Sequence, residues 1–241
     1  MKKTSTILAI GSGLLFSQAQ AEIESEFNVG YNSKYVFRGV DLGDDAYQYG
    51  LDFAGTCDCG FDWSAGIWGI SPDGEDGNVD ELDIYAAVSK DFGGLTASAG
   101  FIVYTYPNGG IADDADAFIG LSGSGFGLDA GVTVFFGTDG QFQEQILVEG
   151  NVGYTYEVSD TFSLSAAFVI GYVADDGQGV YAYDEGMAYY SATLSADIAL
   201  SEDITLAPYV SYVDGNGGTM NYVDAAIEDG VIGGAKLTFS F

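Results

Sequence analysis

The chain has 241 residues, of which 36 are acidic and only six are basic, and it contains no histidine. A net charge of −30 excludes nucleic acid and anionic lipid headgroups as direct partners, because both repel such a chain. The lack of histidine excludes a Ser-His-Asp triad and a histidine metal cluster, so we expect neither an enzyme nor a cofactor. The hydrophobic share of 47% also excludes a disordered chain.

The first residues predict a secretory signal peptide. Lys2 and Lys3 precede an apolar stretch from Ile7 to Phe16, and the small-residue triplet before Glu22 ends at Ala21, where we expect cleavage. No stretch reaches the run of about 20 apolar residues that a membrane-spanning helix requires. Cleavage removes two of the six basic residues and no acidic residue, which leaves a net charge of −32. Residues 22–241 are then expected to form one domain.

The rest of the chain alternates between apolar and polar residues. From Ala188 to Ile198 every second residue is apolar, and the residues between them are mostly polar. This period of two is typical of a strand with one apolar face. It predicts twelve strands, at Glu24–Phe37, Ala46–Thr56, Phe61–Ile70, Val79–Phe92, Leu95–Tyr106, Asp116–Ser124, Phe126–Phe136, Gln141–Glu157, Phe162–Ala174, Met187–Leu200, Thr205–Val213 and Val231–Phe241.

The links between these strands alternate in length. Short turns are predicted at Cys57–Gly60, Gly93-Gly94, Gly125, Ser159–Thr161 and Ser201–Asp203. Longer links are predicted at Val40–Asp45, Ser71–Asn78, Pro107–Ala115, Asp175–Gly186 and Asp214–Gly230, with Thr138–Gly140 as a short exception. Such alternation is typical of an outer-membrane barrel with short periplasmic turns and long external loops. We therefore predict an all-β fold, an antiparallel transmembrane β-barrel of about twelve strands.

A soluble β-sandwich is the alternative fold, because it too has many alternating strands. Against it, the polar strand positions are small residues with few of the lysines that coat a water-facing sheet. The last strand carries Gly233, Ala235, Leu237, Phe239 and Phe241 on one face. It resembles the carboxy-terminal signature that the barrel assembly machinery reads, so this machinery and outer-membrane lipid are expected partners.

The two cysteines stand one residue apart in Cys57-Asp58-Cys59. This spacing allows either a small-ring disulfide or two thiols in the oxidising periplasm. A zinc site is not expected, because zinc prefers four ligands and the chain offers no histidine.

The first strand carries a more specific resemblance. The run from Val29 to Gly39 reads V-G-Y-N-S-K-Y-V-F-R-G. It resembles the opening strand of the TorF-type porin family, approximately V-G-x-x-S-x-Y-V-F-R-G. Lys34 stands where members often have Asp or Asn. The resemblance implies an outer-membrane porin.

If the apolar face of each strand meets lipid, the opposite face points into the lumen. The polar residues predicted to line the pore are Glu26, Asn28, Asn32, Lys34, Arg38, Asp52, Asp62, Asp83, Asp129, Glu149, Asn151, Asp197 and Lys236. Closure pairs the first strand with the last, so Lys34, Arg38 and Lys236 are expected to form one basic stripe opposite acids. Such charges either fill a small barrel with salt bridges or create a transverse field at a constriction.

The longer links are rich in acids. Asp73, Glu75, Asp76 and Asp80 are weak calcium candidates, since calcium prefers several oxygen ligands, but the EF-hand pattern is incomplete and solvated loops are favoured.

We predict a channel for passive diffusion of small cationic or neutral polar solutes. The alternatives are a non-conducting barrel with a structural or adhesion role through its external loops, and a soluble calcium-binding β-protein.

Overall fold

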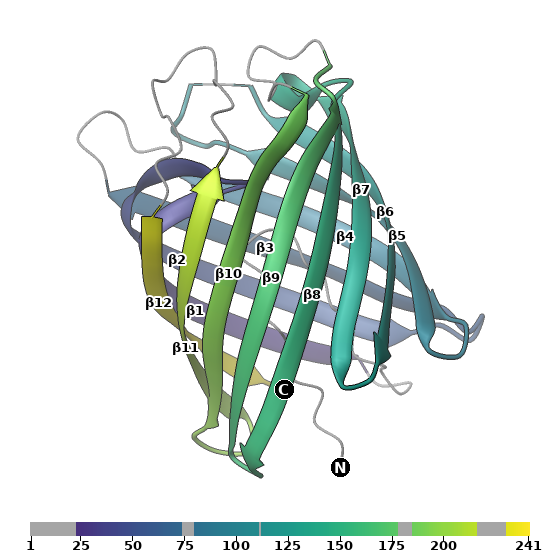
Figure 1. Ribbon diagram of the computed structural model, residues 1–241, viewed down its shortest axis with the longest axis vertical. Coiled ribbons are helices and arrows are strands. Elements are labelled where there is room, and N and C mark those ends of the chain that lie inside the picture. The colour runs from purple at the N-terminus through teal and green to yellow at the C-terminus, as the bar shows by residue number, and fades with distance from the viewer. Residues whose placement is uncertain (1–22, 74–79, 111, 178–184, 216–229) are drawn as a thin grey trace.

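The computed structural model describes residues 23–73, 80–110, 112–177, 185–215 and 230–241 as a single closed β-barrel (Figure 1). The predicted signal peptide lies outside the described residues. The elements are β1 (Glu24–Phe37), β2 (Val40–Thr56), β3 (Asp62–Asp73), β4 (Glu81–Asp91), β5 (Leu95–Thr105), β6 (Asp114–Gly125), β7 (Leu128–Asp139), η1 (Gly140–Phe142), β8 (Ile146–Ser159), β9 (Phe162–Asp175), β10 (Gly186–Ala199), β11 (Ile204–Gly215) and β12 (Gly230–Ser240).

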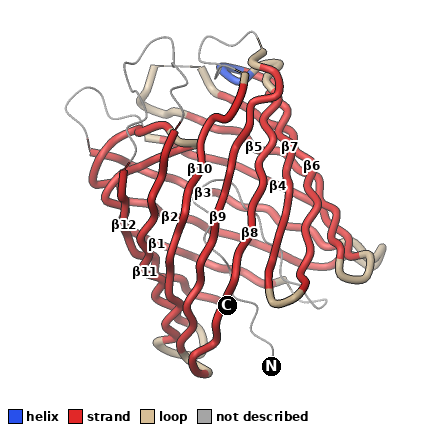
Figure 2. The backbone as a smooth tube through the Cα atoms, viewed as in Figure 1, coloured by secondary structure: helices blue, strands red, loops and turns tan. Residues whose placement is uncertain are grey.

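The predicted twelve-stranded antiparallel barrel is confirmed. Every strand pairs with its neighbours in the sequence, and β1 pairs with β12 to close the sheet. At this closure Phe27 lies opposite Phe239, and their rings stack at 6.1 Å. Figure 2 shows that strands make up nearly all of the described backbone, with η1 at one end of the barrel. None of the helical turns in the described segments is long and apolar enough to cross a membrane.

The two faces of the strands differ as the alternation predicts. On β1 the side chains of Phe27, Val29 and Tyr31 are exposed on the outside, whereas Asn28 and Asn32 are buried inside. The same division recurs on the other strands, where exposed residues such as Ile84, Phe101 and Leu194 face outward. An apolar outer belt is the surface that lipid tails require.

Several predicted boundaries are wrong: the turn predicted at Gly125 consists of Phe126 and Gly127, and two other segments differ by more residues. Val40–Asp45 was expected to be an external link, but it belongs to β2, and the turn consists of Arg38 and Gly39 alone. The register shifts between Tyr35 and Val36, so the extra residues are absorbed by a bulge instead of a loop. Gln141–Gln145 was expected to be strand, but it forms η1 and a turn that places Phe142 in the interior.

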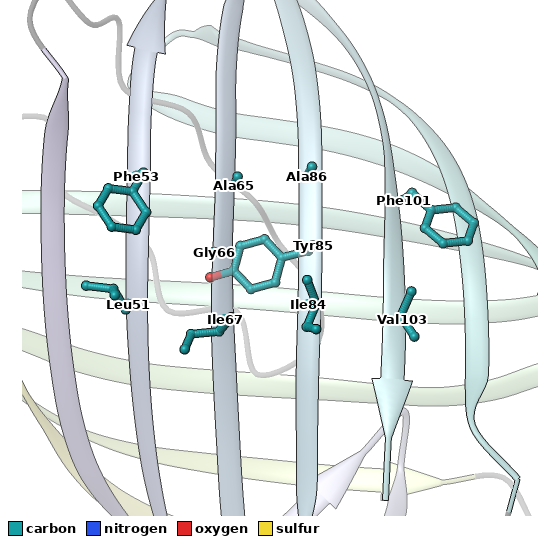
Figure 3. A pocket seen from close by; sticks show the side chains of 10 residues that line it. All are labelled: Leu51, Phe53, Ala65, Gly66, Ile67, Ile84, Tyr85, Ala86, Phe101 and Val103. Carbon is teal, nitrogen blue, oxygen red and sulfur yellow. The ribbon is translucent and has the colours of Figure 1, made fainter.

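Glycines lie opposite large aromatic residues on neighbouring strands. Gly171 is paired with Tyr189, and Gly66 with Tyr85. A Cβ atom at either glycine would come within 3.0 Å of the facing side chain. Figure 3 shows the Tyr85 ring reaching across to Gly66. Gly69 with Tyr49 and Gly100 with Phe118 repeat this arrangement. These glycines therefore give room for rings, in addition to the turns that the sequence suggested.

The turn between β2 and β3 contains a disulfide between Cys57 and Cys59. The backbone N–H of Cys57 donates to the carbonyl of Phe61 at 2.9 Å, and Gly60 N–H donates to Cys57 at 2.9 Å. Of the two alternatives left open by the sequence, the structure contains the disulfide.

Candidate functional site

Arg38 reaches across the barrel lumen. It occupies the β1–β2 turn with φ +48°, and Gly39 follows with φ +82°, the combination that a two-residue hairpin turn of type I′ requires. Its Nη2 atom donates to Oδ2 of Asp116 on β6 at 2.7 Å, and both side chains are 1% exposed. β1 and β6 lie five steps apart in the ring of twelve strands, so this ion pair bridges the interior.

Four aromatic rings surround the Arg38 guanidinium. Its carbon lies 4.9 Å from the ring centre of Phe37, 5.9 Å from Tyr104, 4.7 Å from Phe135 and 5.1 Å from Phe142. We call these four residues the aromatic cage. Tyr104 also donates its hydroxyl hydrogen to Asp116 at 3.2 Å. Cation–π attraction and the ion pair thus act together on one buried charge.

Three further carboxyl groups lie within electrostatic range of Arg38: those of Glu81, Asp83 and Glu149. Tyr35 donates to Oε2 of Glu81 at 2.8 Å, and Tyr189 donates to Glu149. Glu81 and Asp83 also form a side-chain hydrogen bond with each other. We use the term neck for Arg38, the aromatic cage, Asp116, Glu81, Asp83 and Glu149.

Apolar side chains fill the lumen around the neck. One buried cluster contains Val40, Leu147, Val173 and Tyr189 together with three of the caging rings. Its members come from β2, β4 to β10 and η1, which surround most of the barrel. The neck is therefore packed like a protein core.

The segment after β7 helps to close the neck. Asp114 accepts hydrogen bonds from the backbone N–H of Gln141, from Gln141 Nε2 at 3.1 Å and from the hydroxyl of Tyr106 at 2.8 Å. Burial, followed by the charges of Glu81 and Asp114, raises the pKa of Tyr106 well above its ordinary value, so its hydroxyl remains a donor at neutral pH. These bonds hold η1, and with it Phe142, over Arg38.

A second charged group lies near the opposite end of the lumen. Lys236 on β12 interacts electrostatically with Glu26, Asp52 and Asp197. Asn28 Nδ2 donates to Asp52 at 3.3 Å, and Tyr85 donates to the same carboxylate. We call Lys236 and its three acids the basal cluster.

The expected basic stripe does not form. Lys34 is bound by Asp41 at 2.5 Å and Asp44 at 2.9 Å, both on β2. Arg38 turns to Asp116, and Lys236 belongs to the basal cluster. In the β1–β12 register Lys236 lies opposite Gly30, four residues before Lys34, and Arg38 lies in the turn beyond β1, so the three charges stay apart.

The remaining predicted residues lie on the inner face as separate pairs. Asn32 accepts from Tyr209 at 2.7 Å, Asp62 from Thr56 at 2.7 Å, and Asp129 from Ser124. Asn151 lies beside Gly131, where a Cβ would be 2.7 Å from its Oδ1. That these residues line a solute path stays a prediction.

Sequence reasoning missed Asp116, Glu81 and most of the aromatic cage. The sequence placed Asp114 in the link Pro107–Ala115 and Asp116 at the start of a strand, whereas in the structure both belong to β6 and alternate with Ala115. Their spacing of two, continued by the buried Phe118, was a signal that could have placed them on the inner face.

Of the calcium candidates, Glu75 and Asp76 lie outside the described residues. Asp80 accepts from Ser71 at 2.6 Å and from Asn108 at 3.0 Å, so protein donors already bind its carboxylate. Asp73 is exposed at the end of β3. The part of the chain that the structure describes contains no group of three or more acids or cysteines that could hold a metal ion.

A shallow groove of about 450 Å³ lies on the outside of the barrel over β2 to β5 (Figure 3). Its lining is almost wholly apolar, with Phe53, Ile67, Ile84 and Phe101 among the exposed side chains. A groove on the apolar belt would face lipid tails and is not part of the lumen.

A closed antiparallel barrel with an apolar exterior and charged interior groups is the architecture of transmembrane β-barrels. The chain belongs to a bacterial family of unknown function, Gcw_chp, whose model matches residues 17–239. This family carries no functional description, so the resemblance to TorF-type porins stays a hypothesis. Comparison with curated proteins gave no match.

Among the solved structures that share the fold are three outer-membrane proteins. The COG4313 outer membrane channel from Pseudomonas putida F1 has a TM-score of 0.57 at 12% identity, covering 92% of this chain and 97% of that chain. The NanC porin has a TM-score of 0.53 at 14% identity, covering 90% and 98%. The KdgM porin has a TM-score of 0.51 at 10% identity, covering 90% and 99%. At these identities the likeness concerns the fold alone.

Proposed function

We propose that this protein is an outer-membrane channel, of the TorF porin type, for passive diffusion of small cationic or neutral polar solutes. The observation that carries the proposal is the polarity of the interior behind an apolar belt. Asp52, Asp197 and Lys236 all face inward, although a charge inside a protein is costly unless it is paired or hydrated. A lumen that admits water supplies that hydration.

The neck makes the path narrow. Small twelve-stranded barrels lie between filled eight-stranded barrels and open sixteen-stranded porins. Here the Arg38–Asp116 ion pair crosses the lumen and the aromatic cage surrounds it. The proposed channel is therefore closed at the neck in this conformation, and conduction requires the Arg38 turn to move.

The filled neck also favours one alternative, a non-conducting barrel with a structural or adhesion role. In that case the same contacts would serve only to stabilise the fold. The two functions differ in whether displacing the Arg38 turn opens a path for ions.

Localisation and assembly form part of the proposal. The signal peptide would direct the chain to the periplasm, and the barrel assembly machinery would insert it by reading the last strand. Phe241, just beyond β12, is 79% exposed and thus accessible to a partner. A barrel in the outer membrane should sediment with that membrane and migrate differently in gels before and after heating.

Planar-bilayer recording of the refolded protein tests the channel. We expect small, voltage-dependent steps from the native chain and larger or more frequent steps from a variant whose Arg38 turn is displaced. If neither protein conducts ions although gel migration verifies that both are folded, the channel is rejected in favour of the structural barrel.

A further inference from the structure

We propose that the neck is a binding site for organic cations with a guanidinium head, and that Arg38 is its resident occupant. The inference rests on the proposed channel function, because a solute would reach the neck through the lumen. It assigns to that channel a class of ligand and a place where the ligand binds.

The surroundings of Arg38 have the chemistry of a cation receptor. Two phenylalanines of the cage, Phe135 and Phe142, lie within 5.1 Å of the guanidinium carbon, close enough for cation–π attraction. Asp116 supplies the carboxylate whose geometry matches a planar guanidinium. None of these contacts depends on the backbone of Arg38, so a free guanidinium compound could make them as well.

The neck offers more acceptors than Arg38 uses. One guanidinium faces the carboxyl groups of Asp116, Glu81, Asp83 and Glu149. Glu81 and Asp83 form a side-chain hydrogen bond with each other, and Tyr35 and Tyr189 donate to Glu81 and Glu149. Asp116 alone forms an ion pair with Arg38 among the described residues, and the other carboxyl groups add negative charge around the bound cation, which favours a positively charged ligand at this place.

The resident cation is attached in a way that allows it to leave. Arg38 lies in the two-residue turn, outside the paired residues of β1 and β2, which end at Phe37 and Val40. Moving the turn therefore breaks neck contacts and leaves the strand pairing intact. A cationic solute that enters as the turn moves out would replace the same contacts.

The test uses Arg38→Ala, which empties the site, and ethylguanidinium chloride, which reproduces the lost head group. The folded variant in detergent should bind ethylguanidinium saturably in isothermal titration, and the bound ligand should raise its unfolding temperature. The native protein should bind it far more weakly, because its own arginine competes. Ethylammonium chloride at the same concentration controls for ionic strength and should have a smaller effect, since it lacks the planar fork.

Two variants control for the position of the charge. Arg38→Ala combined with Asp116→Ala removes the acceptor and should abolish binding. Lys90→Ala removes a cation that lies outside the neck, where Lys90 Nζ is 4.6 Å from the ring centre of Phe61. This variant should bind ethylguanidinium as weakly as the native protein does. If Arg38→Ala does not refold alone, ethylguanidinium in the refolding buffer must restore the folded gel band.

Bilayer recording of Arg38→Ala separates the two proposals. Conduction that ethylguanidinium blocks supports both. Conduction without any binding of ethylguanidinium would overturn the cation site and leave the channel standing. Saturable binding without conduction by any variant would uphold the site and refute the channel. Equal binding by Arg38→Ala and by the Asp116→Ala double variant would also overturn the inference.

Discussion

A single methyl group would disturb the interior where glycine faces an aromatic ring. Gly171→Ala should lower the free energy of unfolding by about 1–3 kcal/mol, because a Cβ there would overlap the ring of Tyr189, which is 2% exposed and held by Glu149. Gly150→Ala is the matched control, since its nearest atom, on Ile170, is 3.6 Å away. Urea unfolding in lipid vesicles measures both, and equal losses would refute the packing argument.

The Arg38–Asp116 ion pair should show strong coupling. Asp116→Ala alone should cost about 3–5 kcal/mol, because it leaves a buried guanidinium without its carboxylate. Combining it with Arg38→Ala should cost less than the sum of the two single losses, since neither charge is then left unpaired. A double-mutant cycle from unfolding titrations gives the coupling energy. Additive losses would show that the two side chains contribute independently.

At the scale of the element, the β1–β2 turn can be tested by comparing two glycines. Gly39 and Gly93 have φ values of +82° and +87°, so alanine is strained at both. A Cβ atom added at Gly39 would also lie 2.5 Å from the Cβ atom of Tyr189. A Cβ atom added at Gly93 would have no neighbouring atom within 4 Å. We expect Gly39→Ala to displace the turn and increase single-channel conductance, and Gly93→Ala to leave conductance unchanged. The opposite order would place the constriction elsewhere.

The alternation of apolar and polar residues predicted the strands and their inner faces, because each strand has one side toward lipid. Alternation involves only residues that are close in the sequence, so it can be recognised without knowing which strands pair. Asn28 and Asn32 were placed inward on this basis, and both are buried. Gly43, Asp44 and Asp45 predicted a loop by composition, but pairing with β1 draws them into β2.

The neck could not be predicted in the same way. Arg38 meets Asp116 from 78 residues away, and the contact depends on a turn folding inward, for which alternation gives no signal. Phe142 fitted an apolar position of a strand, whereas Asp114 holds its segment in a 3-10 turn. Such contacts follow from the closed shape, which no local pattern encodes.

For the whole molecule, the charge predicts cation preference. The chain has a net charge of −30, which the predicted cleavage at Ala21 would change to −32, and Asp113, Asp175 and Asp176 are among the exposed acids. Reversal potentials across a salt gradient should indicate cation selectivity at low salt. The preference should weaken as the Debye length falls from about 10 Å at 0.1 M to about 3 Å at 1 M. Anion preference at low salt would show that Arg38 or Lys236 governs transport.

Substitution of the terminal residue, Phe241, tests barrel stability and barrel assembly separately. Phe241 is exposed, while its backbone N–H donates to Ser25 at 2.9 Å, a bond that alanine retains. Phe241→Ala should therefore change unfolding by less than about 0.5 kcal/mol, yet reduce the amount of barrel inserted in cells. Phe239→Ala, which removes the stack on Phe27, should destabilise the refolded barrel as well. A comparable loss of stability in both variants would argue against a recognition role for Phe241.

The pairing of β1 with β12 is the one contact in the sheet that joins strands distant in sequence; every other pair is a hairpin between successive strands. The seam is thus an ordinary antiparallel pair whose connecting turn happens to be missing. Joining residue 241 to residue 23 by a short linker and opening the chain at the Gly93-Gly94 turn would preserve all twelve pairings while moving the seam to β4 and β5. In such a permuted barrel the slow, entropically costly closure would shift to a new pair of strands. The location of the seam is therefore a property of the order of synthesis, which the finished barrel does not itself require.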